Sequence, residues 1–510
     1  MRSSFLPYLA CALAGAVIAA AITALDPGRL PAAGFLAAFI LSTAFLSIMA
    51  LAWKKLNASR QAGRIMAAAF ILRLLVGILL FVLLPVYGYD EAPPNAGYLY
   101  LDAYKRDSDA WQLAQSGAPI AEAFTKEFST DQYGGLLSLS AGIYRYLSPD
   151  SHRPLLVLLV TSFAAAIGVP FLWKAASARW GEPTGNLSAW IYALYPESII
   201  LGASQMREPI LIGLSAAAFY GVCMWKENRK HALILLLASV LGILFISLKA
   251  GMALCIVLAL WFWMEHILPK ASRPARIAGW VLLGIACAAG LYASWSWLVD
   301  SSKWDLYLME SSSGRLQWEV ELIGERFRSI FLTVYGLAQP VLPAAIIYPG
   351  IPIMRAIAIF RALGWYTIVP LMLSGFLVLW KTKSSTAKRT ILLFFAAVII
   401  WTLISSARAG GDQWDNPRYR AVFTVWMAVL AAWSWFEAKA QRSSWLCRLL
   451  ILELVYSGFF IQWYLSRYYG LFKRLDFWPM VRLLAIIGVI VVLGGWLFDR
   501  VRSRKPSQRP

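Results

Sequence analysis

Residues 65–88, IMAAAFILRLLVGILLFVLLPVYG, contain only one charged side chain and decide the class of the protein. An apolar run of about 20 residues can cross a bilayer as a helix, because its backbone polar groups then bond within the segment. Similar runs follow along the whole chain, whose 510 residues are 60% hydrophobic and 15% charged. This composition is too apolar for a soluble domain. The sequence therefore predicts an all-α polytopic membrane protein.

The apolar runs divide into about fourteen expected transmembrane helices. These spans are residues 5–25, 33–53, 65–88, 155–174, 187–203, 209–225, 232–248, 251–268, 277–298, 356–380, 390–407, 421–437, 447–466 and 479–498. The first lacks a distinct cleavage site, and a second run follows at once, which favours an uncleaved helix over a signal peptide. Residues 327–348 are also apolar but are interrupted by prolines, which favours a re-entrant or interfacial segment.

Alternate connections between these spans are rich in Lys and Arg, from Lys54 to the tail that ends in Arg509. By the positive-inside rule these connections face the cytoplasm, which places both termini there. The long connections then lie outside, where we expect them to carry short interfacial helices. We predict a multi-pass protein of the bacterial inner membrane. The expected parts are a helical hairpin (1–64), a membrane module (65–300) with a large periplasmic loop (89–154), a second periplasmic loop (301–355), a second membrane module (356–498) and a basic cytoplasmic tail (499–510).

The formal net charge of +20 does not indicate nucleic-acid binding, because the basic residues are dispersed between apolar segments. All five cysteines lie in or against expected spans, which leaves no pair for an outer disulfide and no zinc cluster. The three histidines are scattered and suggest no catalytic pairing. No nucleotide-binding motif is present, so we expect no soluble nucleotide-sugar donor.

The first long loop contains a cluster of acids in the run LDAYKRDSDAWQLAQSG, residues 101–117. A carboxylate close to others and partly desolvated gains basicity, so Asp107 or Asp109 could deprotonate a hydroxyl or amine acceptor. The alternative is that Asp107 or Ser108 only caps a helix that begins near Asp109. Asp412 and Asp415 could bind a divalent cation together with Asp107, although a polar turn explains them equally well.

Ionisable residues also cluster near the ends of other spans. Glu197 lies inside one expected span, where an unpaired charge is costly, and Arg207 with Glu208 opens the next. A structural salt bridge between Glu197 and Arg207 is the plain alternative. Arginines recur on the side where the positive-inside rule expects few: Arg326, Arg328, Arg355 and Arg361 around the re-entrant segment, and Arg418 and Arg420, with Tyr419 between them, in GGDQWDNPRYR. The guanidinium fork suits phosphate oxygens, whereas snorkelling or local pairing with acids is the alternative.

Several of these elements together resemble the GT-C class of membrane glycosyltransferases, which includes protein O-mannosyltransferases and the aminoarabinose transferases of lipid A. The stretch DSDAWQLAQSG is followed by Tyr133 and Gly134, then by Pro196 and the turn from Ser204 to Glu208. The resemblance covers about residues 100–225 and, more faintly, the loop near Arg418. It implies an acidic catalytic base in the first outer loop, Glu208 in the active cavity, and Arg418 to Arg420 holding a lipid phosphate.

The chain departs from the family pattern in two respects. The large loop follows the third expected span instead of the first, so residues 1–64 are an added hairpin. The acidic motif reads Asp-Ser-Asp instead of Asp-Glu, which leaves the base open between Asp107, slightly favoured, and Asp109. The resemblance predicts an inverting transferase that moves a sugar from a polyprenyl-phosphate donor to a lipid or glycan acceptor at the periplasmic face. The alternatives are a surface-polysaccharide polymerase or ligase, and a lipid-linked glycan transporter.

Overall fold

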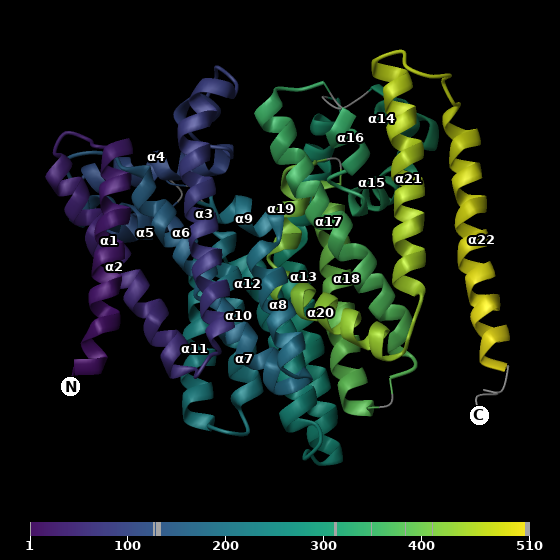
Figure 1. Ribbon diagram of the computed structural model, residues 1–510, viewed down its shortest axis with the longest axis horizontal. Coiled ribbons are helices and arrows are strands. Elements are labelled where there is room, and N and C mark those ends of the chain that lie inside the picture. The colour runs from purple at the N-terminus through teal and green to yellow at the C-terminus, as the bar shows by residue number, and fades with distance from the viewer. Residues whose placement is uncertain are drawn as a thin grey trace. The chain divides into compact units, whose positions relative to one another are not determined.

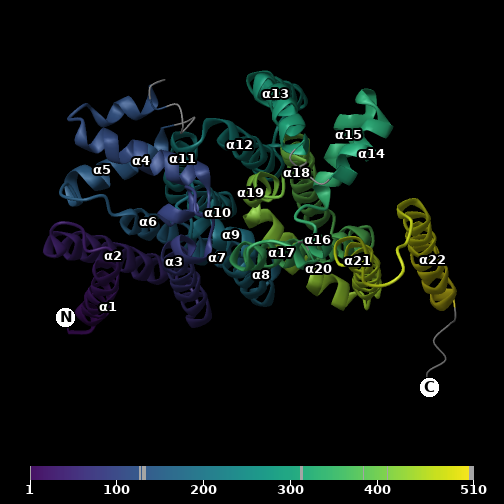
Figure 2. The same ribbon diagram turned by 90° about the horizontal axis from the view of Figure 1, so that it is seen from above.

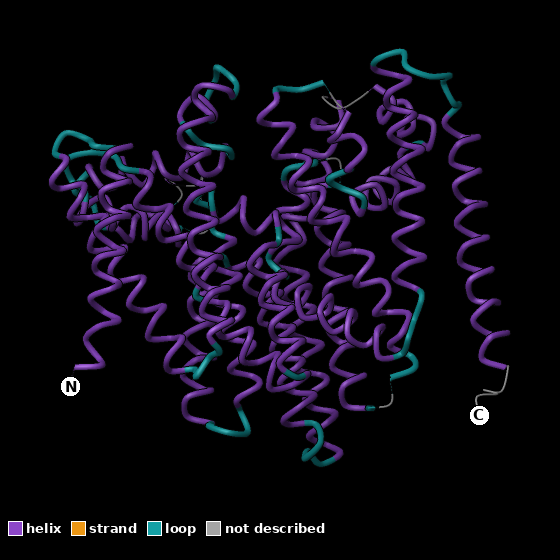
Figure 3. Tube along the Cα trace, in the orientation of Figure 1, coloured by secondary structure: helices purple, strands orange, loops and turns teal. Residues whose placement is uncertain are grey.

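The computed structural model describes residues 2–125, 128, 134–310, 314–347, 349–382, 384–410 and 412–504. Within these residues every regular element is a helix and no strand occurs (Figure 3). Eleven helical stretches of the described chain are long and apolar enough to cross a membrane, or twelve if one bent pair forms a single span. The all-α prediction is confirmed, and the helices are those of a multi-pass membrane protein. The number of stretches is lower than the expected fourteen.

Part of the difference comes from residues 187–203, which form two short helices instead of one span. Helix α8 (Glu182–Leu194) ends before Tyr195, and α9 (Pro196–Gly202) begins directly after it. A residue that precedes proline is disfavoured in the helical conformation, and Tyr195 accordingly has a ψ of 114°.

The expected span at 209–225 corresponds to α10 (Glu208–Met224), which has 17 residues. A helix of that length is about 26 Å long, somewhat less than the hydrocarbon thickness of about 30 Å. The expected span at 421–437 lies in α20 (Thr424–Ala440), which together with α19 (Asp415–Ala421) forms a pair bent by 74°.

The segment expected to be re-entrant, residues 327–348, is also broken. It contains α15 (Glu325–Leu337) and α16 (Leu342–Ile347), neither of which is long enough to be a span, and Pro340 lies in the break between them. Helix α13 (Arg273–Glu310) continues well past the expected end of its span at residue 298, and its candidate spanning part is Arg273–Tyr292.

The chain divides into two compact units, each formed by two stretches of sequence. The first unit comprises residues 1–337 and 396–429, and the second comprises residues 338–395 and 430–510. Apart from the helices of residues 89–154, the first unit also contains α1 (Arg2–Leu25), α2 (Pro31–Lys55), α3 (Arg60–Tyr87), α6 (Pro154–Ala166), α7 (Gly168–Trp180), α11 (Arg229–Ile246), α12 (Leu248–Phe262) and α14 (Gly314–Ile323), with a π-helical turn at Trp263–Ile267.

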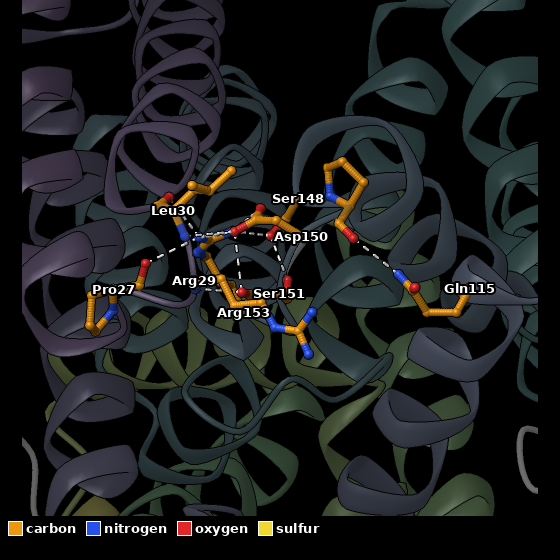
Figure 4. A network of polar contacts seen from close by, with 9 residues as sticks. Pro27, Arg29, Leu30, Gln115, Ser148, Asp150, Ser151 and Arg153 are labelled. Atoms are coloured by element: carbon orange, nitrogen blue, oxygen red, sulfur yellow. Dashed lines mark hydrogen bonds and ion pairs between the residues drawn. The ribbon is translucent and has the colours of Figure 1, made fainter.

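Helices α1 and α2 form an antiparallel hairpin that packs beside α6 and α3 (Figure 1). The connection between them is fixed by the buried guanidinium of Arg153, which donates hydrogen bonds to the carbonyl oxygens of Pro27 at 3.1 Å and Leu30 at 2.9 Å (Figure 4). Both carboxylate oxygens of Asp150 lie 2.7 Å from the same guanidinium. A Cβ at Gly34 would lie 2.7 Å from Arg153 Nε, so the close approach of the hairpin requires glycine there.

The long loop at residues 89–154 is largely helical. It contains the 3₁₀ turns η1 (Pro94–Ala96) and η2 (Ile120–Phe124) and the helices α4 (Leu101–Gln115) and α5 (Gly135–Leu147). Helices α4 and α5 pack side by side (Figure 2) through a cluster of buried side chains that includes Leu113, Leu137 and Tyr144. The structure thus gives this loop the short helices expected of it.

Fourteen of the 17 residues of α10 are buried, and the helix packs against α6, α7, α11 and α12. Its contact with α6 is close because Gly213 carries no side chain. A Cβ at Gly213 would lie 1.9 Å from the carbonyl oxygen of Ala164. Small residues allow such close backbone approach between helices in a membrane.

The second unit contains α16, α17 (Pro352–Leu379), α21 (Trp445–Tyr468), α22 (Phe477–Arg504) and parts of α18 (Ser385–Ala409) and α20. Helix α21 packs against α16, α17 and α22. Arg448 of α21 forms a bidentate ion pair with Asp499 of α22, at 2.6 and 2.7 Å.

Candidate functional site

Asp107 lies on the inner face of α4 and is hydrogen-bonded on both carboxylate oxygens. The hydroxyl groups of Tyr98 and Tyr144 donate to Oδ2 and Oδ1, each at 2.6 Å, and His152 Nε2 lies 2.9 Å from Oδ2. Asp107 is only 2% exposed. It shares this face of α4 with Ala103, four residues earlier, as the helical period requires. The carboxylate therefore binds two tyrosines and a histidine together.

Burial, together with the Asp107 carboxylate, raises the pKa of Tyr98 and Tyr144 well above the usual value for tyrosine. Both hydroxyls therefore remain protonated and act as donors. The imidazole of His152 also stacks on Trp111, with 5.5 Å between the ring centroids. The sequence suggested no pairing for His152, because it lies 45 positions after Asp107, with all of α5 between them.

Asp109, the other proposed base, does not take part in this network of tyrosines and histidine. Its side chain is partly exposed, and burial raises its pKa while the nearby Lys105 opposes that effect.

A second charged cluster is centred on Arg418 of α19. The guanidinium is 4% exposed and contacts three carboxylates, one through each nitrogen. Nη2 lies 2.8 Å from Asp102 of α4, Nε lies 3.0 Å from Glu208 of α10, and Nη1 lies 3.1 Å from Asp415 of its own helix. We call these four residues the Arg418 cluster. It joins the beginnings of α4 and α10 to α19, whose Arg418 lies 210 positions after Glu208 in the sequence.

The carboxylates of the Arg418 cluster differ in their exposure. The side chain of Asp102 is 53% exposed and that of Asp415 is 37% exposed, whereas that of Glu208 is 2% exposed. Burial raises the pKa of Asp102, but the charge and hydrogen bond of Arg418, together with the charges of Arg106 and Arg207, outweigh burial and hold the pKa below the usual value. Asp102 is therefore an ionised carboxylate that can be reached from outside the cluster.

Glu208 has one oxygen in the cluster and one outside it. Its Oε1 binds Arg418 and lies 3.8 Å from Arg207 Nε, while the buried Oε2 has no hydrogen-bond partner. Tyr419 also supports the cluster, because its hydroxyl donates to Asp415 at 3.3 Å and its ring lies 5.3 Å from the Arg418 guanidinium carbon.

The two sites on α4 are held to the core by Arg106. This residue is 4% exposed, and its guanidinium donates a hydrogen bond to the carbonyl oxygen of Gln205, in the turn between α9 and α10. Asp102 lies five positions before Asp107, so the two carboxylates project from different sides of α4. One helix thus contributes to both the tyrosine-lined site and the Arg418 cluster.

The other predicted site residues take up varied positions. Glu197 is buried at the start of α9, and Arg420 is 1% exposed and donates to the Leu337 carbonyl oxygen at 3.4 Å. Arg326 is exposed beside the ring of Phe327, and Arg328 is half-buried. Arg355 is exposed and Arg361 is buried, both in α17 of the second unit. Tyr133 lies outside the described residues.

Asn416 and Arg420 attach α19 to the end of α15. Asn416 Nδ2 donates to the Gly336 carbonyl oxygen at 2.8 Å, next to the Leu337 carbonyl that accepts from Arg420. Arg326 and Arg328 are near the opposite end of that helix, at least eight residues from Gly336. At 1.5 Å per residue this is about 12 Å or more along the axis. The C-terminal end of α15 is therefore held by its backbone carbonyl groups against α19, the helix that carries Arg418.

Among the described residues, no group of three or more His, Cys, Asp or Glu side chains is arranged to hold a metal ion. Asp412, which could have joined Asp415 and Asp107 as a ligand, instead accepts hydrogen bonds from the backbone N–H groups of Trp414 at 2.6 Å and Asp415 at 3.2 Å. It closes a polar turn at the start of α19, and Asp107 lies among the tyrosines on the inner face of α4.

Asp102 is the residue whose role sequence reasoning missed, although it stands in the acidic run. Asp102 stands in the first turn of α4, which begins at Leu101. The helix was expected to begin near Asp109 with Asp107 or Ser108 as its cap, and that expectation is wrong, because both residues lie inside the helix. Comparison with known proteins adds no assignment: no family model, no curated protein and no solved structure matches this chain.

Proposed function

We propose that this protein is an inverting glycosyltransferase that takes a sugar from a polyprenyl-phosphate donor and transfers it to a cell-envelope acceptor at the periplasmic face. The observation that carries the proposal is the Arg418 cluster. A buried arginine on a late helix meets one accessible carboxylate, Asp102, from the long early loop. Such a pair provides a binding group for a phosphate and a base for an acceptor at one place.

Arg418 is suited to hold the phosphate because its charge is permanent and its nitrogens form a planar fork. Asp102 Oδ2 lies 2.8 Å from Arg418 Nη2. A phosphate oxygen can take the same nitrogen, since Asp102 is the most exposed of the three carboxylates. Glu208 is 2% exposed and would stay in place to fix the orientation of the guanidinium.

The displaced Asp102 carboxylate would then act as general base. The acceptor hydroxyl or amine attacks the anomeric carbon, its proton passes to Asp102, and the bond between the anomeric carbon and the phosphate oxygen breaks. The lipid phosphate leaves with the electron pair, and Arg418 stabilises its charge. A single displacement of this kind inverts the anomeric centre.

Asp107 is the rival base, but its surroundings favour a positioning role. Both of its oxygens already accept hydrogen bonds, and it is 2% exposed. It links Tyr98 to α4 and so fixes the segment that leads into Asp102. Asp109 is not among the three carboxylates that contact Arg418, and its side chain is only partly exposed.

The proposal is tested by transfer from a radiolabelled polyprenyl-phosphate sugar with purified protein in lipid. We expect Asp102→Asn to abolish transfer and Asp107→Asn to reduce it less. Arg448→Lys, at an ion pair in the second unit, is the matched control and should leave transfer unchanged. Normal transfer by both aspartate variants would reject the assignment, and loss only with Asp107→Asn would move the base to that residue.

A further inference from the structure

Helix α15 carries an exposed apolar face. Phe327, Ile330 and Val334 recur at intervals of three and four residues, which places them on one side of the helix. Their side chains are 54%, 61% and 60% exposed. We call these three residues the α15 stripe. Large apolar side chains gathered on one exposed face mark a surface that binds a membrane or another protein.

The contact of α15 with α14 uses a different face of the helix. Val320 of α14 and Leu332 of α15 are both buried, and Phe331 and Tyr335 pack against them. The two helices lie side by side (Figure 2). The α15 stripe takes no part in this small core, so its exposure does not depend on how the two helices pack against each other.

Hydrogen bonds at the C-terminal end of α15 fix its position. The carbonyl oxygens of its last two residues accept hydrogen bonds from the side chains of Asn416 and Arg420 in α19. Helix α19 in turn binds the first residue of the apolar helix α10, through Arg418 and Glu208. The predicted topology places this end of α10 at the outer face of the bilayer. The same contacts therefore place the end of α15 near the outer lipid headgroups.

The chemistry of the surface favours lipid as its occupant. Arg326 is exposed directly before the stripe, and its guanidinium carbon lies 5.7 Å from the centre of the Phe327 ring. Such an arginine can bind a headgroup phosphate while the apolar side chains beside it enter the boundary of the acyl chains. In the sequence, α15 also lies between the candidate spans Arg273–Tyr292 and Pro352–Leu379, so a bilayer is within its reach.

We propose that α15 lies in the interface of the outer leaflet, with the α15 stripe among the upper acyl chains and Arg326 at the lipid phosphates. Interfacial helices of this kind bury their apolar face by about 5–10 Å. The occupant is the phospholipid of the bilayer itself, so the inference does not depend on transfer activity. Because α15 is bonded to α19, this docking also holds Arg418 at the depth of the headgroups.

The experiment measures the contact between α15 and lipid in the full-length protein. A cysteine-free form receives Val334→Cys in the stripe or Ser329→Cys on the polar side of α15, and the thiol is labelled with an environment-sensitive fluorophore. The proteins are placed in phosphatidylcholine–phosphatidylglycerol nanodiscs with a nitroxide near the top or near the end of the acyl chains. We expect blue-shifted emission at position 334 that the upper nitroxide quenches most, and weaker quenching at position 329.

A charge in the stripe should undo this contact. Ile330→Asp, combined with the reporter at position 334, should reduce the quenching and shift the emission to longer wavelength. The Tm should stay unchanged, because the Ile330 side chain is 61% exposed. Ser329→Asp adds the same charge on the polar side and is the matched control, which should leave the quenching unchanged. If Ile330→Asp fails to fold, Ile330→Ser should give a smaller loss of quenching in the same direction.

The possible results decide between lipid and the other occupants. Quenching at position 334 that Ile330→Asp lowers and Ser329→Asp does not supports the proposal, whether or not transfer activity is found. Blue-shifted emission without quenching would mean that protein covers the stripe, and water-like emission would mean that nothing apolar does. Either result overturns the proposal, as does equal quenching at positions 334 and 329, and transfer activity in the same preparation would leave the proposed function standing.

Discussion

Replacing Arg418 by lysine is the sharpest perturbation of the cluster, because it preserves the charge and removes the three-way geometry. The guanidinium reaches Asp102, Glu208 and Asp415 through three different nitrogens, at 2.8, 3.0 and 3.1 Å. A lysine ammonium has one nitrogen and cannot meet all three carboxylates at those positions. We therefore expect Arg418→Lys to lower the free energy of unfolding.

The size of the loss follows from exposure. Asp102 and Asp415 are 53% and 37% exposed, so solvent replaces most of their lost contact and each is worth about 0–1 kcal/mol. The contact with Glu208, 2% exposed, is a buried charged hydrogen bond worth about 1.5–3 kcal/mol. We expect a total of about 2–4 kcal/mol.

The assay is reversible unfolding in mixed micelles, with Arg448→Lys as the matched control. The Arg448 pair is more exposed, 14% and 33% for its two side chains, and should lose less than about 1 kcal/mol. Glu208→Gln in the Arg418→Lys background should recover about 1–2 kcal/mol, because it removes a buried charge that has lost its hydrogen bond to the guanidinium. Equal losses for both lysine variants, or no recovery, would refute the reasoning.

Four further predictions concern other parts of the molecule. Gly213→Ala should destabilise the protein by several kcal/mol (~2–4) and lower the Tm clearly, because its Cβ would lie 1.9 Å from the Ala164 carbonyl oxygen. Gly284→Ala, which meets nothing within 4 Å, should leave the Tm unchanged or raised. Burial raises the pKa of Asp26 from 3.8 to about 6, so the folded protein favours the protonated carboxyl group. The contribution of Asp26 to stability is therefore present below pH 3.8 and is lost as the pH rises through 6. Asp26→Asn should raise the Tm at pH 8 but not at pH 4. The hydrogen bonds from Arg153 lower the pKa of Asp150 to about 2, so the contribution of this pair should be present above pH 3.8 and lost as the pH falls through 2. In a cysteine-free background, a membrane-impermeant maleimide applied to spheroplasts should label a cysteine at Tyr146 but not one at Lys270, and the reverse result would invert the proposed topology.

The helices could largely be predicted from hydropathy, and their interruptions could not. Residues 65–87 lie in one long helix, α3, which includes Pro85 near its end and follows the expectation closely. Pro196 splits the span expected at 187–203, and the Arg420–Thr424 region bends by 74° with no proline at the bend. Hydropathy averaged over a window of residues does not predict these breaks and bends, because they depend on local backbone geometry and tertiary contacts.

The candidate site was predictable in its residue types and less so in its pairings. An acid from the early loop does meet an arginine from a late one, but the acid is Asp102, whereas Asp107, the favoured base, contacts Tyr98, Tyr144 and His152. The sequence could not tell which acid of α4 contacts Arg418. Asp102 and Asp107 are five positions apart, so they face different sides of the helix: Asp107 contacts Tyr98 and Asp102 contacts Arg418. That choice depends on where α4 begins, and sequence boundaries carry errors of a few residues.

A structure of the protein with bound polyprenyl monophosphate would test the proposed function most directly. We expect phosphate oxygens within about 3 Å of the Arg418 guanidinium nitrogens, with Asp102 displaced from Nη2 and Glu208 still bound to Nε. A phosphate bound elsewhere, with Arg418 still paired to Asp102, would contradict the proposal.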